Sequence, residues 1–96
     1  MSAVEKYTGW FARSSAGRDR GRIFCVIGAD PDCGRLFLAD GKRRKLNRPK
    51  AKRLLHLELL ADGSGRPATE KLKQGGTLTD AELRRTLCAF RDEMEA

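Results

Sequence analysis

The sequence predicts a mainly β fold, a small module of four to five strands with a C-terminal α-helix. The chain has 96 residues, which is enough for one domain with a modest core. Short apolar runs alternate with glycine turns in residues 9–60, whereas residues 79–95 repeat their apolar positions at helical spacing. We therefore expect a β domain at residues 9–60, a linker at 61–78 and a helix at 79–95.

The first strands are predicted from apolar runs and the turns that separate them. Residues 10–13 begin with three aromatic or apolar residues and end with Arg13, and residues 14–21 contain glycines that allow a tight connection. The β-branched and aromatic run 22–28 follows, and residues 30–34 have the Asp, Pro and Gly of a reverse turn. Residues 35–39 then predict a partner strand, so we expect a hairpin.

A basic segment interrupts this pattern at residues 42–53. Asp40 and Gly41 predict a turn at its start. Few apolar residues follow, and Pro49 cannot sit in a central strand because it has no backbone N–H to donate. We expect this segment to lie at an edge of the sheet.

Leucines at every second position predict a closing strand after the basic segment. Leu55, Leu57 and Leu59 alternate with His56 and Glu58. A period of two places the leucines on one face of a strand, so we expect this strand to be half-buried.

The C-terminal part of the chain differs in composition. Residues 61–78 are rich in Gly, Ser, Pro and charge, which is typical of a flexible linker with room for a short helical turn at 69–74. Thr79 and Glu82 then fit a helix capping box, and Leu78 and Leu83 are placed to form a hydrophobic staple. An apolar stripe follows, made of Leu83, Leu87, Phe90 and Met94. This stripe docks on the sheet or, alternatively, binds a partner or a second copy.

Positive charge is concentrated in one segment. Residues 13–53 hold thirteen Lys and Arg against four Asp and Glu, which gives +9 of a whole-chain charge of +7. A basic patch on a folded β-module is typical of a nucleic-acid binder. The alternative is a solvated basic face, although solubility alone favours interspersed charges of both signs.

The order of several segments resembles a KOW domain. These segments are residues 16–22, the apolar run 23–27, residues 36–41, the basic run 42–47, and His56-Leu57-Glu58. Over residues 10–60 the order is similar to the ribosomal large-subunit protein family of the fourteen-e type and its small bacterial KOW relatives. The resemblance implies an SH3-like β-barrel, an RNA partner and an association with the ribosome.

The candidate RNA-binding residues come from two parts of the basic segment. Gly17 and Gly21 bracket the first loop and Gly41 opens the second turn, so these glycines are the predicted structural turn residues. Arginine grips a phosphate through two parallel N–H groups, whereas lysine acts as a point charge. We read Asp19 as a turn residue rather than as an ion-pair partner of its neighbours. The predicted RNA contacts are Arg13, Arg18, Arg20, Arg22, Lys42, Arg43, Arg44, Lys45, Arg48, Lys50, Lys52 and Arg53.

Aromatic residues do not indicate a base-stacking platform. Phe24 and Phe37 lie within apolar runs, where we expect core positions. Tyr7 and Trp10 are the remaining candidates for stacking on bases. This pattern favours recognition of RNA backbone and shape over recognition of a base sequence.

Catalytic, metal and cofactor sites are not predicted. His56 is the only histidine and has no sequence-adjacent nucleophile, and no phosphate-loop or paired-carboxylate motif is present. Cys25, Cys33 and Cys88 have the spacing of neither a zinc site nor a disulfide framework, so we expect reduced thiols. We expect the cysteines of the predicted strand and helix to act as small hydrophobic residues.

These observations predict a non-enzymatic RNA-binding protein of the translation machinery. We expect ribosomal RNA as the partner, with contacts to ribosomal proteins. The longest uncharged apolar run, 23–29, is too short to cross a bilayer, so we expect no membrane partner and a cytosolic location. The rival hypothesis is a protein-interaction adaptor that uses the β-module or the tail helix. The sequence leaves the oligomeric state and the particular RNA open.

Overall fold

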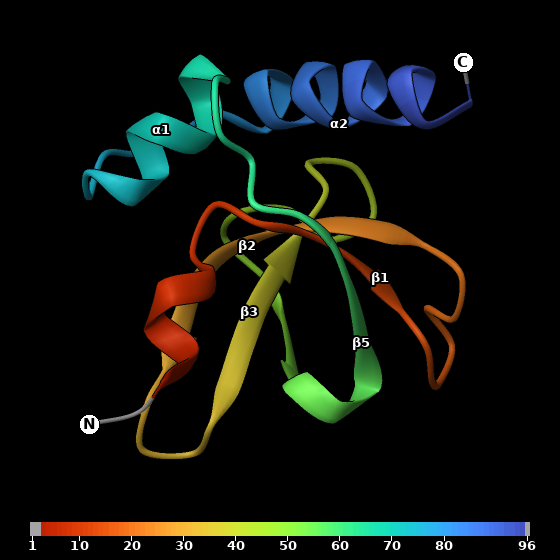
Figure 1. Ribbon diagram of the computed structural model, residues 1–96, viewed down its shortest axis with the longest axis vertical. Helices are drawn as coiled ribbons and strands as arrows, with labels where there is room; N and C mark the ends of the chain where they lie inside the picture. The colour runs from red at the N-terminus through yellow and green to blue at the C-terminus, as the bar shows by residue number, and fades with distance from the viewer. Residues whose placement is uncertain (1–2, 96) are drawn as a thin grey trace.

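The computed structural model describes residues 3–95 and has one antiparallel sheet with helices packed beside it (Figure 1). The strands are β1 (Phe11–Ser14), β2 (Ile23–Asp30), β3 (Arg35–Ala39), β4 (Lys50–Arg53) and β5 (Leu57–Ala61). The helices are the 3-10 helices η1 (Ala3–Tyr7) and η2 (Leu54–His56), and the α-helices α1 (Pro67–Lys73) and α2 (Asp80–Glu95). The prediction of a mainly β fold with a C-terminal helix is confirmed.

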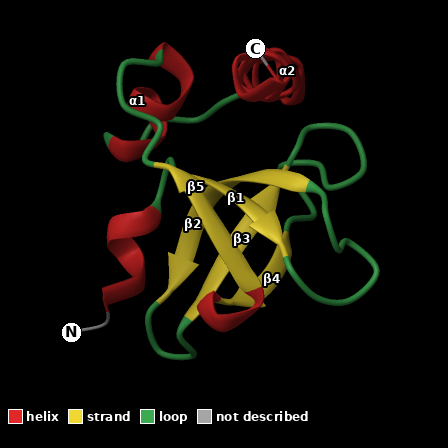
Figure 2. Cartoon of the chain, turned by 45° about the vertical axis from the view of Figure 1, so that its right-hand side comes forward, coloured by secondary structure: helices red, strands yellow, loops and turns green. Residues whose placement is uncertain are grey.

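The sheet has the strand order β4-β3-β2-β1-β5 and is strongly curled (Figure 2). β2 and β3 form the predicted hairpin, with Asp30 opposite Arg35 beside the turn. The end of the basic segment forms β4, and its edge position is compatible with Pro49 directly before it. Within residues 3–95, β4 and β5 pair with no strand on their outer sides, so the sheet is open.

The closing strand begins later than the leucine alternation predicts. Leu54–His56 form η2, and β5 starts only at Leu57. The prediction is therefore wrong for Leu55, which is 72% exposed. The chain changes direction here because β4 and β5 lie at opposite edges of the sheet, and the 3-10 turn that makes this change directs Leu55 outward. Leu57 and Leu59 do pack against the core.

The two faces of the sheet support two apolar clusters, because successive side chains of a strand point to opposite faces. The inner cluster contains Val4, Ala12, Phe24, Val26, Leu36 and Leu38. The outer cluster contains Phe11, Cys25, Ala39, Leu83, Leu87 and Phe90. Burial raises the pKa of the Cys25 thiol to about 12, so this group stays protonated and acts as a small hydrophobic side chain. Cys33 and Cys88 are exposed, and for Cys88 the expected apolar packing is wrong.

α2 completes the outer cluster and lies across one end of the sheet (Figure 1). The predicted capping box is present: the Glu82 N–H donates to Thr79 Oγ1 at 3.1 Å, and the Thr79 N–H donates to Glu82 Oε1 at 3.2 Å. Leu83, Leu87 and Phe90 of the stripe are buried, which confirms docking on the sheet. Met94, the last residue of the stripe, is 42% exposed.

The segment that composition marks as a flexible linker contains α1 and is held by specific contacts. The Thr69 hydroxyl contacts the carbonyl oxygens of Gly63 and Arg66. The Arg66 guanidinium lies 5.3 Å from the ring centre of Phe11 and 5.4 Å from that of Phe90. Its Nη2 is also 2.7 Å from a carboxylate oxygen of Glu93 on α2. These contacts join α1, α2 and β1, and composition alone does not reveal them.

The capping box makes stability depend on pH. The hydrogen bond from Lys71 and then the bond from the Thr79 N–H hold the pKa of Glu82 below its ordinary value. A carboxylate with a lowered folded-state pKa contributes stability above its unfolded pKa, and this contribution is lost as pH falls through the folded pKa. We expect Glu82→Gln to destabilise the protein at neutral pH, with a difference from wild type that shrinks between about pH 5 and about pH 3. Denaturant unfolding at a series of pH values measures this difference, and a constant difference for Glu82→Gln would contradict the interpretation.

Candidate nucleic-acid interface

The β1–β2 loop has a fixed backbone that presents three arginines. The Gly21 N–H donates to the Ser14 carbonyl at 2.8 Å, and the Arg22 N–H donates to the Asp19 carbonyl at 2.9 Å. Gly17 and Gly21 adopt φ values of 77° and 86°, which lie in the left-handed region that favours glycine. Arg18, Arg20 and Arg22 therefore project from an ordered loop.

Lys52 ties the edge strand β4 to this loop. Its ammonium donates to Ser14 Oγ at 2.5 Å and to the Ala16 carbonyl at 2.6 Å. Close by in the chain, the carbonyl of His56 accepts a hydrogen bond from the Ser15 N–H at 2.9 Å. The side chain of Lys52 thus bridges β4 and the end of β1, and its charge lies at the base of the loop.

An ion pair joins the β1–β2 loop to the β3–β4 loop. Asp19 is only 5% exposed, and its carboxylate lies 3.0 Å from the guanidinium of Arg44. Reading Asp19 as a turn residue was incomplete, because its carbonyl closes the turn while its side chain pairs with the distant Arg44. The buried carboxylate brings the two arginine-rich loops together.

Gly41 allows the β3–β4 loop to pass close to α2. It has a φ of 78°, and a Cβ at this position would collide with the backbone oxygen of Asp80. Asp80 itself accepts a hydrogen bond from the Leu46 N–H at 2.8 Å. The start of α2 therefore helps to position the second basic loop.

Three depressions on this side of the molecule form a continuous basic surface. The first has a volume of about 590 Å³ and lies beside the last turn of α2; its cations are Arg13, Arg22, Lys42, Arg43 and Arg91. The second has a volume of about 620 Å³ and lies beside β4; its cations are Arg18, Arg35, Arg44, Lys50, Lys52 and Arg53. A third depression shares Arg22 and Arg43 with the first, and Arg18 and Arg44 with the second. We call these cations together the basic surface, with a helix end and a β4 end.

The basic surface contains every predicted RNA contact except Arg20, Lys45 and Arg48. Arg20 instead directs its Nε to the carbonyl of Ser15 at 3.3 Å. The surface also contains Arg35 and Arg91, which the sequence interpretation missed. Arg35 lies directly opposite Arg53 in the β3–β4 ladder, so knowledge of the register would have identified it. The docking of α2 adds Arg91, and the sequence gives no signal for that juxtaposition.

Most cations of the basic surface have no side-chain partner among the residues that the structure describes. Arg13 lies 3.4 Å from Glu58, Arg44 pairs with Asp19, and Lys52 bonds to the loop. Considering only contacts among residues 3–95, the other cations take part in no side-chain hydrogen bond or ion pair; they are Arg18, Arg22, Arg35, Lys42, Arg43, Lys50, Arg53 and Arg91. Like charges opposite each other in a ladder, such as Arg35 and Arg53, destabilise a sheet, and a bound anion would relieve this repulsion.

Among the described residues, no Phe, Tyr or Trp side chain lines any of the three depressions, and the one aromatic ring there is the imidazole of His56 at the β4 end. Phe24 is fully buried, as predicted, whereas Phe37 is partly buried and outside both clusters. Tyr7 and Trp10 form an edge-to-face pair at 5.1 Å and pack against the inner cluster. The basic surface is therefore rich in positive charge and carries a single imidazole in place of a platform of several stacking rings.

Removing the buried carboxylate of Asp19 is expected to destabilise the protein, because this group holds the β1–β2 and β3–β4 loops together. Asp19→Asn leaves Arg44 without its counter-ion, and we expect a loss of about 1–3 kcal/mol in the free energy of unfolding. The estimate is modest because the Arg44 side chain is 32% exposed and water screens the pair. Asp32→Asn, in the exposed β2–β3 turn, is the matched control. Chemical denaturation measures both variants, and equal stabilities would show that the ion pair is not structural.

Comparison with known proteins assigns no family: no protein-family model matches the chain, and no curated protein matches it.

Within residues 3–95, no group of three or more His, Cys, Asp or Glu side chains is placed to hold a metal ion. His56 is exposed and lines the β4 end of the basic surface. Among the helices of the described residues, none combines the length and apolar character needed to cross a bilayer.

Proposed function

We propose that this chain is a non-enzymatic RNA-binding protein that grips the RNA backbone with its basic surface. One observation carries the proposal: unpaired cations from separate parts of the chain lie on one continuous surface. They come from the β1–β2 loop, β3, the β3–β4 loop, β4 and α2. A polyanion is the partner that such a surface fits best.

The electrostatics make phosphate the main determinant of affinity. Each phosphate that a Lys or Arg neutralises releases a condensed counter-ion, so binding weakens as salt increases. If about six cations of the basic surface contact phosphates, the slope of log K against log salt is about −4 to −5.

The lining of the depressions favours backbone and shape over a base sequence. Most of the free cations are arginines, whose planar guanidinium fits two phosphate oxygens at once. Single-strand readers instead display several exposed aromatic rings, whereas the imidazole of His56 is the one such ring among the described residues that line these depressions. A folded RNA with closely spaced phosphates is therefore the expected ligand.

The proposal extends to a KOW-type module with an SH3-like barrel that works in translation. The segments in residues 10–60 that resemble this family support it. So does the curled five-stranded sheet, in which Lys52 bridges from the β4 edge to the loop after β1. Ribosomal RNA is then the proposed ligand, with ribosomal proteins as neighbours and the cytosol as the compartment, where free cysteines stay reduced.

A salt series tests the proposal. Fluorescence polarisation of a labelled ribosomal RNA hairpin with the purified full chain is measured from about 50 mM to about 300 mM salt. The proposal predicts a steep slope of about −4 to −5 and little preference among base-paired stem sequences of the same shape. Binding that is absent at low salt, or that does not change with salt, would reject a backbone-gripping function.

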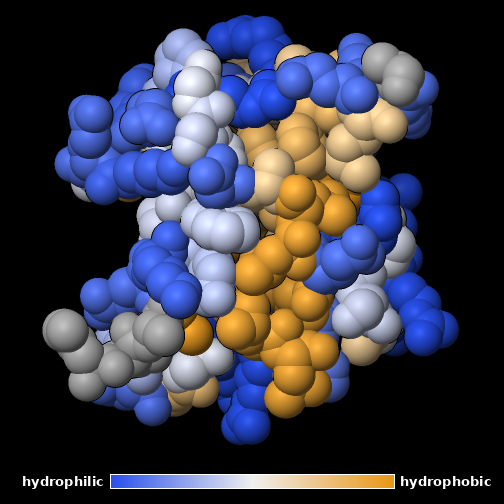
Figure 3. Space-filling view, viewed as in Figure 1, coloured by the Kyte–Doolittle hydropathy of each residue, from blue (hydrophilic) through white to orange (hydrophobic). Residues whose placement is uncertain are grey.

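A protein-interaction adaptor is the second candidate, and one observation favours it. An apolar band crosses the face shown in Figure 3, over the region where η2 and β5 lie in Figure 1. Leu55 of η2 is also exposed. Leu55→Glu separates the two functions because Leu55 lines none of the basic depressions. RNA affinity is expected to stay unchanged in this variant, whereas an adaptor would lose a polypeptide partner.

A further inference from the structure

The two ends of the basic surface differ in chemistry. Among the described residues that line the β4 end, the one carboxylate is that of Asp19, which is buried and paired with Arg44. At the helix end, Asp40 and Glu95 line the depression together with the apolar side chains of Ile23 and Met94. Carboxylates repel phosphate, and apolar side chains make no favourable contact with it. Phosphate binding alone therefore does not explain why carboxylates and apolar side chains line the helix end.

We infer that the helix end binds one unpaired RNA base, preferentially guanine, while the rest of the basic surface holds the phosphates beside it. This inference rests on the proposed RNA-binding function and adds a base-specific subsite to it. Unpaired bases in loops and bulges are the parts of a folded RNA that a protein can read by their Watson–Crick edges.

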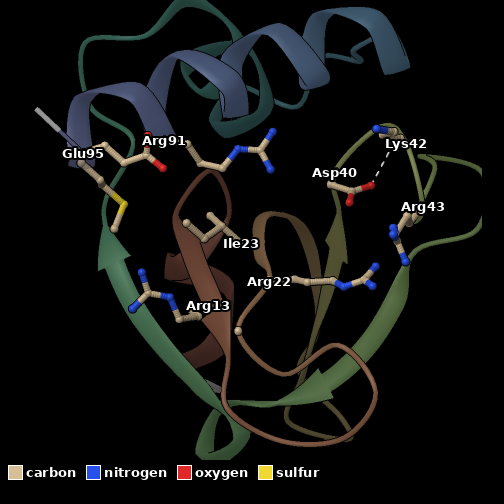
Figure 4. Close-up of a pocket in the computed structure, with 10 residues that line it drawn as sticks. Arg13, Arg22, Ile23, Asp40, Lys42, Arg43, Arg91 and Glu95 are labelled. Carbon is tan, nitrogen blue, oxygen red and sulfur yellow. Dashed lines mark hydrogen bonds between the residues drawn. The ribbon is translucent and has the colours of Figure 1, made fainter.

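The shape of the depression suits a base. Its volume of about 590 Å³ lies within the usual range of small-ligand pockets. In Figure 4 the side chains of Arg13 and Glu95 lie toward one end, those of Lys42 and Arg43 toward the other, and Ile23 lies between them. A base between the two ends would have cations on either side for its flanking phosphates.

Apolar and planar groups are available to cover the faces of the base. Met94 is 42% exposed, although it continues the buried stripe of α2. A methionine thioether packs favourably against aromatic rings, so a base would cover this exposed apolar group. Arg22 and Arg91 add guanidinium planes, which stack on bases in RNA complexes.

The carboxylates supply the selectivity. Asp40 Oδ1 accepts a hydrogen bond from the backbone N–H of Lys42 at 2.9 Å (Figure 4). It also accepts one from the backbone N–H of Arg44 at 2.9 Å, and the two bonds fix the loop. Glu95 has no hydrogen-bond or ion-pair partner among the residues that the structure describes. A carboxylate only accepts hydrogen bonds, and guanine offers two adjacent N–H donors, N1–H and N2–H, that match its two oxygens.

Synthetic RNA hairpins with one bulged nucleotide test the subsite. The full chain is titrated with hairpins whose bulge is guanosine, inosine or an abasic residue, at one salt concentration. We expect the guanosine bulge to bind about tenfold more tightly than the abasic bulge, with inosine between them because it lacks the 2-amino group. Equal affinities for the three hairpins would overturn the inference and leave the backbone-gripping function in place. Failure to bind any hairpin would instead reject the proposed function.

Two variants connect the preference to the helix end. Glu95→Gln should lower the preference for guanosine over inosine several-fold, and Met94→Ala should weaken binding of both while the abasic hairpin binds as before. The matched controls are Asp92→Asn, which removes the same charge from an α2 residue outside the depression, and Leu55→Ala, which truncates a distant exposed apolar residue. A control that changes the preference as much as its matched variant would overturn the assignment.

Discussion

A variant that loses four free arginines of the basic surface is expected to bind RNA about 10²–10³-fold more weakly at about 100 mM salt. The changes are Arg18→Gln, Arg22→Gln, Arg35→Gln and Arg43→Gln. Each lost phosphate contact keeps roughly 0.7–0.9 of a counter-ion on the RNA, so the slope of log K against log salt should become shallower by about 3. Polarisation titrations of wild type and variant across the salt series measure both quantities.

The matched control removes the same net charge from elsewhere. Its changes are Lys6→Gln, Lys45→Gln, Arg48→Gln and Arg85→Gln, at exposed residues that line none of the three depressions. The control should lose less than about tenfold in affinity, because its charges act only through the screened long-range field. If both quadruple variants lost affinity equally, net charge rather than the basic surface would explain binding. Lys45 and Arg48 are sequence-predicted contacts, so this comparison also tests whether the structure narrows the site correctly.

Truncation of Phe90 is expected to cause the largest loss of stability. Phe90 is 6% exposed, and its ring stacks on Phe11 with centres 4.2 Å apart and planes at 19°. Phe90→Ala removes this contact and leaves a cavity under Arg66. We expect the two effects together to lower the free energy of unfolding by about 3–5 kcal/mol. For a domain of this size the melting temperature should fall on the order of 15 °C, as measured by circular dichroism.

Met94→Ala is the control for this stability measurement. Met94 lies four residues further along the same helix, but it is largely outside the outer cluster. Its truncation should change the free energy of unfolding by less than about 0.5 kcal/mol. Equal destabilisation by the two substitutions would show that α2 does not dock through the face described above.

Local patterns in the sequence predicted several elements correctly. The spacing of Thr79 and Glu82 predicted the start of α2, because a capping box is a contact between residues three positions apart. The apolar runs around Phe24 and Leu36 predicted the β2–β3 hairpin for a similar reason, since its turn lies between them in the chain.

Features that depend on distant contacts were missed. Arg35 joins the site because the ladder places it opposite Arg53, eighteen positions further along the chain. The pairing of Asp19 with Arg44 needs two loops to meet, and the repeat of leucines gave no sign that a 3-10 turn would expose Leu55. α1 is ordered by Arg66, whose partners lie on β1 and α2. Composition describes a segment and carries no information about which partners that segment meets.

The central claim is that one continuous basic surface contacts the RNA. An NMR titration of the isotope-labelled full chain with a ribosomal RNA hairpin tests it most directly, because each backbone N–H reports its own environment. We expect the largest shifts in residues 15–22, at Arg35, in residues 42–44, in residues 50–53 and in the last turn of α2 from Arg91 onward. Shifts that instead map to α1, or to Leu55 of η2 and the adjoining strand β5, would contradict the account.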